Sequence, residues 1–175
     1  MASIRILLAD DHAETRLATR RLLAGHSDWV ICGEADNGID AVEKAATLKP
    51  DLVILDLSMP KMSGLEAAKI IHAAAPSLPL LLFSINGANL QALEEVRPAG
   101  FRGIVSKANA WLLPEVVTLL LQGKTYFDGN APALAGALKE AEAAVEAQPP
   151  AADEPPAAKK AAAGADDPGE PPPVA

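Results

Sequence analysis

The feature that most constrains the fold is a regular alternation, from Ile4 to about Phe127, of short apolar runs with segments of helical periodicity. Short continuous apolar runs are typical of strands that are buried on both faces of a sheet, as parallel strands are. Apolar side chains three or four positions apart are typical of helices with one buried face. The alternation therefore predicts an α/β fold in which helices cover both faces of a doubly wound, five-stranded parallel sheet.

Turn and capping residues support the bounds of the expected elements. The strands are expected at residues 4–9, 29–33, 52–55, 80–84 and 103–106, and the helices at residues 12–24, 39–48, 64–74, 90–96 and 114–123. Ser63 is placed to cap the third helix, because its side chain can accept a hydrogen bond from a backbone N–H group of the first turn. Pro114 marks the start of the fifth helix, since proline lacks the backbone donor that an interior position needs.

A change of composition near residue 127 divides the chain. Residues 131–175 are dominated by alanine, proline and acidic residues, and they carry 3 basic and 8 acidic side chains. Such a segment buries too little apolar surface to offset the entropy that ordering it would cost. We therefore expect one domain over residues 1–127 and a tail over residues 128–175, with a possible short helix at 133–148 and disorder elsewhere.

Charge and composition narrow the classes of partner. The formal charge is −8, the pI is near 4.8, and the sequence has no cluster of basic residues. These features argue against direct binding to DNA or to an anionic membrane.

The one cysteine, Cys32, cannot form an internal disulfide and lies among apolar residues that suggest a core position. No stretch is long enough to span a bilayer, so we expect a soluble, cytoplasmic protein.

Polar residues follow or end four of the five expected strands. The first strand is followed by Asp10 and Asp11, the third by Asp56, and the fifth by Lys107, while Ser84 ends the fourth. Singly, each could be a helix cap, a turn residue or a solvated strand end. In a parallel sheet, however, ligands bind beyond the carboxyl ends of the strands, where these side chains are expected to meet.

Converging carboxylates at one rim predict a bound cation. Mutual repulsion raises a carboxyl pKa or requires a positive ion, and oxygen ligands with room for water suit Mg²⁺. We expect Asp11 and Asp56 to bind Mg²⁺ directly, Asp10 to bind it through water, and the backbone carbonyl of Ser58 to complete the protein ligands. Such a site suits phosphoryl transfer. Asp56 would be the nucleophile, Lys107 would neutralise the charge of the phosphoryl oxygens, and Ser84 would donate a hydrogen bond to the transferred group.

The three histidines, His12, His26 and His72, lack metal-ligand spacing, and His12 is interpreted as a solvated residue at a helix start.

Four stretches carry a resemblance to a known family. They are "ILLADDH", "PDLVILDLSMPKMSGLEAAKII", "LPLLLFS" and "AGFRGIVSKA", and over about residues 3–127 they resemble bacterial response-regulator receiver domains, especially the NarL/LuxR-like branch. The resemblance implies a flavodoxin-like receiver fold with a non-enzymatic role in a two-component phosphorelay. It implies that a histidine kinase or phosphotransfer protein phosphorylates Asp56, with Mg²⁺ bound through Asp10 and Asp11. It also implies that Ser84 then moves and changes the surface of the fourth helix, fifth strand and fifth helix, which contacts a downstream protein.

Three departures from the family pattern leave an alternative open. Ile104 stands where receivers commonly have tyrosine or phenylalanine, and Ile85 stands where they have a small residue. The first would weaken switching and the second would narrow access to Asp56. No helix-turn-helix follows residue 127, so direct DNA binding is not expected. The alternative function is therefore a phosphorylation-independent, receiver-like interaction module. A small-molecule phosphatase is disfavoured, because Ser58 stands where a second carboxylate would be needed.

Overall fold

The structure is a computed structural model that describes residues 3–85 and 94–127. Its elements are β1 (Ile4–Ala9), α1 (Ala13–Leu23), β2 (Trp29–Ala35), α2 (Gly38–Leu48), β3 (Leu52–Leu55), α3 (Gly64–Ala74), β4 (Leu80–Ser84), β5 (Phe101–Ser106), the 3₁₀ helix η1 (Lys107–Leu112) and α5 (Leu113–Leu121). Most of the helix expected at 90–96 and the whole tail, with its possible helix at 133–148, lie outside the described residues. Residues 94–96 are helical.

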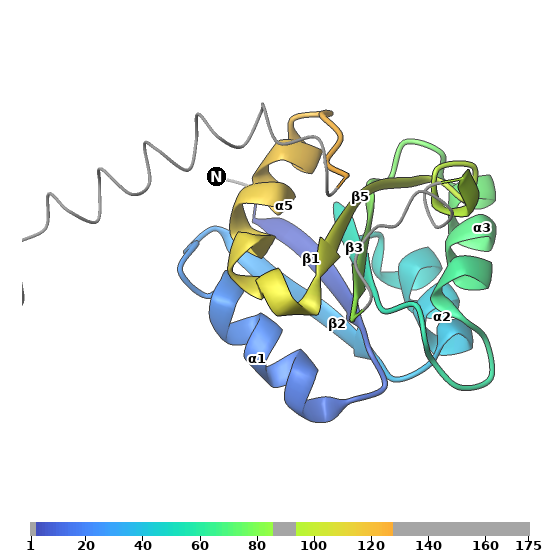
Figure 1. Ribbon diagram of the computed structural model, residues 1–175, viewed down its shortest axis with the longest axis horizontal. Coiled ribbons are helices and arrows are strands. Elements are labelled where there is room, and N and C mark those ends of the chain that lie inside the picture. The colour runs from blue at the N-terminus through green and yellow to red at the C-terminus, as the bar shows by residue number, and fades with distance from the viewer. Residues whose placement is uncertain (1–2, 86–93, 128–175) are drawn as a thin grey trace, which may run out of the picture. The chain divides into compact units, whose positions relative to one another are not determined.

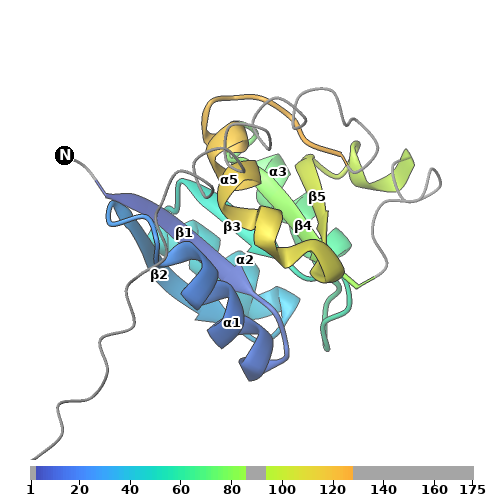
Figure 2. The same ribbon diagram turned by 60° about the vertical axis from the view of Figure 1, so that its left-hand side comes forward.

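The five strands form one parallel sheet in the order β2-β1-β3-β4-β5. Helices α1 and α5 lie on one face of this sheet, and α2 and α3 lie on the other (Figures 1 and 2). Because the strand order reverses direction after β1, the chain winds to one side and then to the other. The predicted doubly wound, five-stranded α/β fold is confirmed.

The sheet is buried because helices cover it on both sides. Every residue of β3 and β4 is buried, and Val53, Ile54 and Leu80 have no exposed surface. Both faces of these strands therefore carry apolar side chains, as the uninterrupted runs predicted. Burying one Leu, Ile or Val side chain contributes about 1.5–3 kcal/mol, so these central strands anchor the residues that follow them.

The first turn of α3 is capped as the sequence predicted. The Ser63 side chain accepts a hydrogen bond from the Glu66 backbone N–H, and the Glu66 carboxylate accepts one from the Ser63 backbone N–H at 2.9 Å. This reciprocal arrangement satisfies two backbone donors that the helix itself leaves unpaired. It fixes where the turn after β3 ends and α3 begins.

The structure differs from the expected elements at β2, which continues two residues past the expected bound to Ala35, and around β5. Strand β5 begins at Phe101, two positions before the expected bound, and α5 begins at Leu113 with Pro114 in its first turn. Proline is tolerated there because first-turn N–H groups have no helical partner. The 3₁₀ helix η1 was not predicted; the Ser106 side chain caps it by accepting a hydrogen bond from Ala108 N–H at 3.3 Å.

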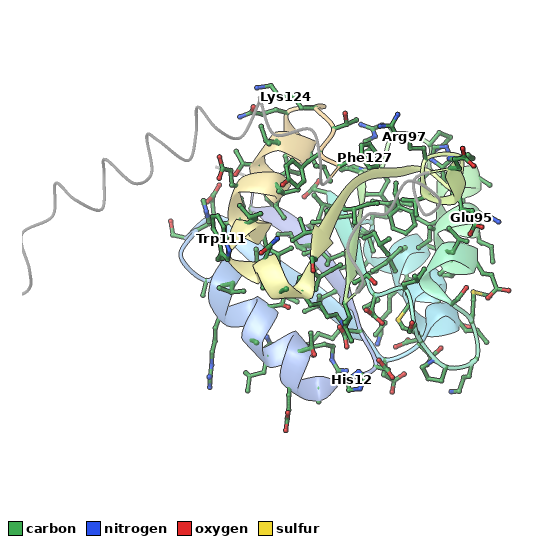
Figure 3. All side chains as sticks on the ribbon, viewed as in Figure 1. His12, Glu95, Arg97, Trp111, Lys124 and Phe127 are labelled. Carbon is green, nitrogen blue, oxygen red and sulfur yellow. The ribbon has the colours of Figure 1, made fainter. Side chains whose placement is uncertain are left out.

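The last described residues return to the outer edge of β5. The Ile104 N–H donates to the Tyr126 carbonyl at 2.8 Å, and the Tyr126 N–H donates to the Arg102 carbonyl at 2.9 Å. Phe127 is buried in the main hydrophobic core, and the Arg97 guanidinium lies 4.5 Å from the centre of its ring (Figure 3). Tyr126 and Phe127 therefore pack as part of the folded unit.

Two further expectations can be compared with the described part of the chain. Cys32 is partly buried and packs against the hydrophobic core, close to the core position that was expected. Among the described helices, none has the length and apolar character that crossing a bilayer requires.

Candidate functional site

Two buried carboxylates stand just past neighbouring central strands. Asp10 follows β1 and is 1% exposed, and Asp56 follows β3 and is 5% exposed. Their backbones continue the sheet pairing, since Asp10 N–H donates to Ala35 carbonyl at 3.1 Å and Asp56 N–H donates to Ala9 carbonyl at 2.8 Å. The backbone is therefore fixed where both side chains leave it.

Lys107 joins these two carboxylates. Its Nζ atom lies 2.7 Å from Asp10 Oδ2 and 2.8 Å from Asp56 Oδ1. Burial alone would lower the pKa of Lys107, but the contacts with Asp10 and Asp56 outweigh burial and raise that pKa above its ordinary value. The amine is therefore a cation at neutral pH. Three of the residues expected at the strand ends do come together.

Asp10 retains capacity to accept further contacts. Its Oδ1 accepts a hydrogen bond from His12 N–H at 2.9 Å. Its buried Oδ2 pairs with the Lys107 ammonium at 2.7 Å and accepts no other contact from the residues that the structure describes. A carboxylate oxygen has two lone pairs, so Oδ2 can accept a second contact. The residues therefore fit a hard cation that takes oxygen ligands.

Asp11 and His12 extend the acidic cluster toward solvent. The Asp11 side chain is 29% exposed, and its Oδ1 lies 2.7 Å from Nδ1 of His12. The ligand atoms of Asp10, Asp11 and His12 all lie within 4.8 Å of one another. Spacing along the sequence gave no reason to include His12, yet the turn after β1 brings it to the carboxylates. That group does not include Asp56, so joint binding of one ion by Asp11 and Asp56 stays a prediction.

The turn between β3 and α3 is shaped around Asp56. The Ser58 backbone N–H donates to Asp56 Oδ2 at 2.9 Å, so this amide helps to orient the Asp56 carboxylate. Ligation of a metal by the Ser58 carbonyl stays a prediction. Gly64 N–H donates to the Leu57 carbonyl at 3.0 Å. A Cβ atom at Gly64 would overlap the Asp56 carbonyl oxygen, so only glycine allows this close return of the chain.

Two serines link the ends of β4 and β5. Ser84 is 7% exposed and pairs in register with Ser106. The Ser106 hydroxyl donates to the Ile85 carbonyl at 3.5 Å, which ties the turn after β4 to the element that carries Lys107. Contact of the Ser84 hydroxyl with a transferred group stays a prediction. Of the two unusual positions, Ile104 is fully buried and Ile85 is 73% exposed.

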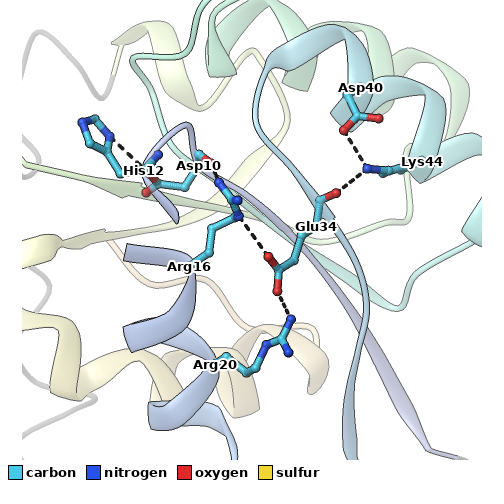
Figure 4. Close-up of polar contacts among 7 residues, drawn as sticks. All are labelled: Asp10, His12, Arg16, Arg20, Glu34, Asp40 and Lys44. Atoms are coloured by element: carbon cyan, nitrogen blue, oxygen red, sulfur yellow. Dashed lines mark hydrogen bonds and ion pairs between the residues drawn. The ribbon is translucent and has the colours of Figure 1, made fainter. Parts of the chain in front are cut away.

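A cluster of charged residues that was not predicted from the sequence, Arg16, Arg20 and Glu34, lies next to the acidic pair Asp10 and Asp11. The guanidinium of Arg16 donates through Nη1 to the Asp10 backbone carbonyl at 2.7 Å and through Nε to Glu34 Oε2 at 3.0 Å (Figure 4). Glu34 also contacts Arg20, and its backbone carbonyl accepts from Lys44. No motif marks these residues, because they come from separate elements that only the fold brings together.

The arrangement can do a definite kind of chemistry. Two buried carboxylates, those of Asp10 and Asp56, lie with the Lys107 cation and the partly exposed Asp11 at one rim, where the carboxyl ends of the strands meet. Carboxylates can hold a divalent cation, and a cation together with an ammonium group can neutralise the oxygens of a phosphoryl group. A carboxylate can also act as a nucleophile, and the Asp56 carboxylate is held in position by its contacts with Lys107 and Ser58.

Comparison with known proteins points to one family. A family model described as the response regulator receiver domain matches residues 6–113. The chemotaxis protein CheY of Thermotoga maritima is 34% identical over 103 residues, which cover 59% of this chain and 84% of that protein. The crystal structure of a LuxR family two-component response regulator from Aurantimonas sp. SI85-9A1 superposes with a TM-score of 0.68 and 26% identity, and covers 81% of this chain and 99% of that chain.

Some relatives are much longer proteins. A protein-glutamate methylesterase/protein-glutamine glutaminase of Methanosarcina acetivorans is 48% identical over 81 residues, which cover 46% of this chain and 23% of that protein. The chain spans between 21% and 24% of the length of the first five curated relatives, all of which bear that enzyme name. The shared part is thus a fraction of each of those enzymes.

Proposed function

This chain belongs to the response regulator receiver domain family, and from that premise we propose that it accepts a phosphoryl group on Asp56 and signals through protein contacts. The donor is a histidine kinase or a phosphotransfer protein, and the setting is a cytoplasmic phosphorelay. In this proposal the chain is not an enzyme. It acts as a switch whose state depends on the phosphorylation of one carboxylate.

The observation that carries the proposal is the position of Lys107 between two carboxylates. Its ammonium lies within 2.8 Å of both Asp10 and Asp56, which follow different strands. Burying two carboxylates beside one lysine costs free energy, and such costly clusters of charge are typical of functional sites. A phosphoryl acceptor uses all three, since the nucleophile must be ionised and the incoming group must be neutralised.

The residues at the rim fit a magnesium ion. Asp10, Asp11, Asp56 and the Ser58 carbonyl would hold it, and the spare capacity of the buried Asp10 Oδ2 supports that fit. When bound, Mg²⁺ supplies positive charge against the oxygens of the phosphoryl group.

The chain's own residues carry the transfer. One carboxylate oxygen of Asp56 forms a bond to phosphorus while the bond from phosphorus to the donor's histidine nitrogen breaks. The electron pair of the broken bond returns to the imidazole, which takes up a proton. Lys107 holds a negative oxygen of the transferred group, and the Ser84 hydroxyl donates a hydrogen bond to another.

Output follows from the same site. We assign to Ser84 a movement toward the phosphoryl group, which alters the surface formed by the fourth helix, β5 and α5. That surface contacts a downstream protein. Neither DNA nor a membrane is the direct target, because the chain is acidic, with a formal charge of −8.

Acetyl phosphate tests the proposal without the kinase. The full chain incubated with acetyl phosphate and Mg²⁺ is expected to gain the mass of one phosphoryl group, as intact mass spectrometry measures it. Asp56→Asn is expected to gain none, and Lys107→Gln is expected to react far more slowly. No adduct on the wild type would refute the proposal, and an adduct on Asp56→Asn would place the acceptor elsewhere.

A second candidate is an interaction module that works without phosphorylation. Ile104, fully buried on β5, provides neither a ring nor a donor that could couple to Ser84, and this observation favours the alternative. It predicts that acetyl phosphate leaves both the mass and the amide spectrum of the protein unchanged. A mass adduct with shifted β5 and α5 amides would exclude it.

A further inference from the structure

We propose that Arg16 is a positioning residue for the acidic pair, holding the peptide group between Asp10 and Asp11 so that the Asp11 carboxylate faces the magnesium site. This inference rests on the proposed function, because it concerns the metal that phosphorylation needs. Glu34 keeps the Arg16 guanidinium in place and balances its charge.

The geometry places Arg16 between two strand ends. It belongs to α1, its side chain is 18% exposed, and its Nε donates to Glu34 Oε2 at 3.0 Å on β2. The Nη1 atom of the same guanidinium donates to the Asp10 carbonyl at 2.7 Å (Figure 4). A guanidinium is planar and rigid, so two contacts made in different directions fix its orientation.

The contact with the Asp10 carbonyl acts on Asp11. That carbonyl belongs to the peptide group that joins the two aspartates, and a peptide group is planar, so its orientation sets the direction in which the chain enters Asp11. Asp10 itself is already fixed by the bond from its N–H to Ala35 and by the bond that its Oδ1 accepts from His12. Asp11 lies just past the paired strand in a bend, and Arg16 supplies a restraint at that point.

Charge and position predict opposite effects for the loss of Arg16. A cation near a divalent metal site repels the metal, so removal of the Arg16 charge alone would tighten Mg²⁺ binding. Removal of the bond to the Asp10 carbonyl frees the peptide group and weakens binding, because a residue that supports a metal ligand affects affinity. The direction of the change therefore separates the two roles.

Arg20 provides a matched control. It lies one turn further along α1 and donates a hydrogen bond to the same Glu34 carboxylate. Its side chain is 55% exposed, and it makes no hydrogen bond to the Asp10 carbonyl among those of the described residues. Arg20→Gln thus removes the same charge from the same ion pair and leaves the Asp10 carbonyl bond in place.

The experiment compares Arg16→Gln, Arg16→Lys and Arg20→Gln with the wild type in the full chain. Amide NMR titration with MgCl₂ measures Mg²⁺ affinity, and urea unfolding measures stability. We expect both Arg16 variants to bind Mg²⁺ about tenfold more weakly, since lysine cannot make both contacts of the guanidinium. Arg20→Gln is expected to bind as tightly as the wild type or slightly more tightly. In metal-free protein, the Asp11 amide signal should shift in the Arg16 variants and not in Arg20→Gln.

The possible failures are distinguishable. Wild-type affinity in Arg16→Gln, or equal weakening in Arg20→Gln, would overturn the positioning role while leaving the proposed function intact. A wild type that binds no Mg²⁺ would refute the metal site itself, and the metal-free Asp11 signal would then decide whether Arg16 restrains this residue. An Asp11 signal that does not respond to Arg16→Gln would overturn the inference in either case.

Discussion

Lys107 lies beside two carboxylates that come from different strand ends, and this single side chain determines the charge balance of the rim. Asp10 and Asp56 are nearly buried, so each depends on a partner for its charge. Because both depend on the same ammonium, loss of Lys107 leaves two charges uncompensated, whereas loss of Asp56 leaves Asp10 and Lys107 still paired.

This asymmetry gives a stability prediction. In metal-free buffer, Lys107→Gln is expected to lower the free energy of unfolding by about 2–3 kcal/mol, below the full cost of breaking a buried ion pair because the Lys107 side chain is 16% exposed. Asp56→Asn is the matched control and should cost less, or stabilise the protein. Urea unfolding followed by circular dichroism measures both. Equal losses in the two variants would show that Lys107 does not balance both carboxylates.

The sequence located some of these residues and could not locate others. Asp10, Asp56 and Lys107 were predicted to meet because each directly follows an expected strand, and parallel strands bring their carboxyl ends to one edge. Arg16 lies inside a helix, where a charged residue usually indicates only solvent exposure, and Glu34 lies beyond the bound expected for its strand. Their joint contact depends on how α1 packs against the sheet, which no local pattern specifies.

At the level of elements, the N-terminus of α3 fixes the turn that carries Asp56. The hydrogen bonds from the Ser63 backbone and side chain lower the pKa of Glu66 below its ordinary value. A carboxyl group with a lowered pKa in the folded state stabilises the protein above its unfolded pKa, and this contribution is lost as the pH falls through the lowered value.

Glu66→Gln is therefore expected to lower stability at neutral pH, and the difference from the wild type should shrink as the solution becomes acidic. Thermal unfolding between neutral pH and pH 3 measures this difference. Glu43→Gln provides the control, because it removes the same charge from an exposed position inside α2, away from the helix end. A difference that stays constant across the acidic range would contradict the prediction.

Element bounds were predictable where a local chemical signal exists. The serine cap of α3 and the bounds of β3 and β4 follow from Ser63 and from uninterrupted apolar runs. The 3₁₀ helix after β5 was not foreseen, because it depends on the Ser106 side chain meeting a nearby backbone N–H. The extension of β5 to Phe101 depends on pairing with β4, which is a tertiary contact.

For the whole molecule, the last described residues pack at the β5 edge. Tyr126 and Phe127 are 7% and 6% exposed, so the chain is still packed at the last described residue. We propose that residues 1–127 form the complete receiver domain and that residues 128–175 add nothing to its stability.

Two truncations test this boundary. A chain that ends at residue 127 is expected to unfold at the same urea concentration as the full chain. A chain that ends at residue 123 loses two buried aromatic side chains and is expected to be less stable by at least about 3 kcal/mol, the usual cost of removing one such side chain. If the 1–127 chain were markedly less stable than the full chain, the tail would have to contact the domain.

The two edge strands of the sheet, β2 and β5, differ in how much of their backbone is free to pair. At the β5 edge, the backbone of Tyr126 already bonds the Ile104 N–H group and the Arg102 carbonyl. The described part of the chain places no strand outside β2, where Val30 is 44% exposed. Unpaired strand backbone is the template on which proteins aggregate. Among the described strands, intermolecular pairing is therefore favoured at β2 over β5, where Tyr126 occupies these two backbone groups.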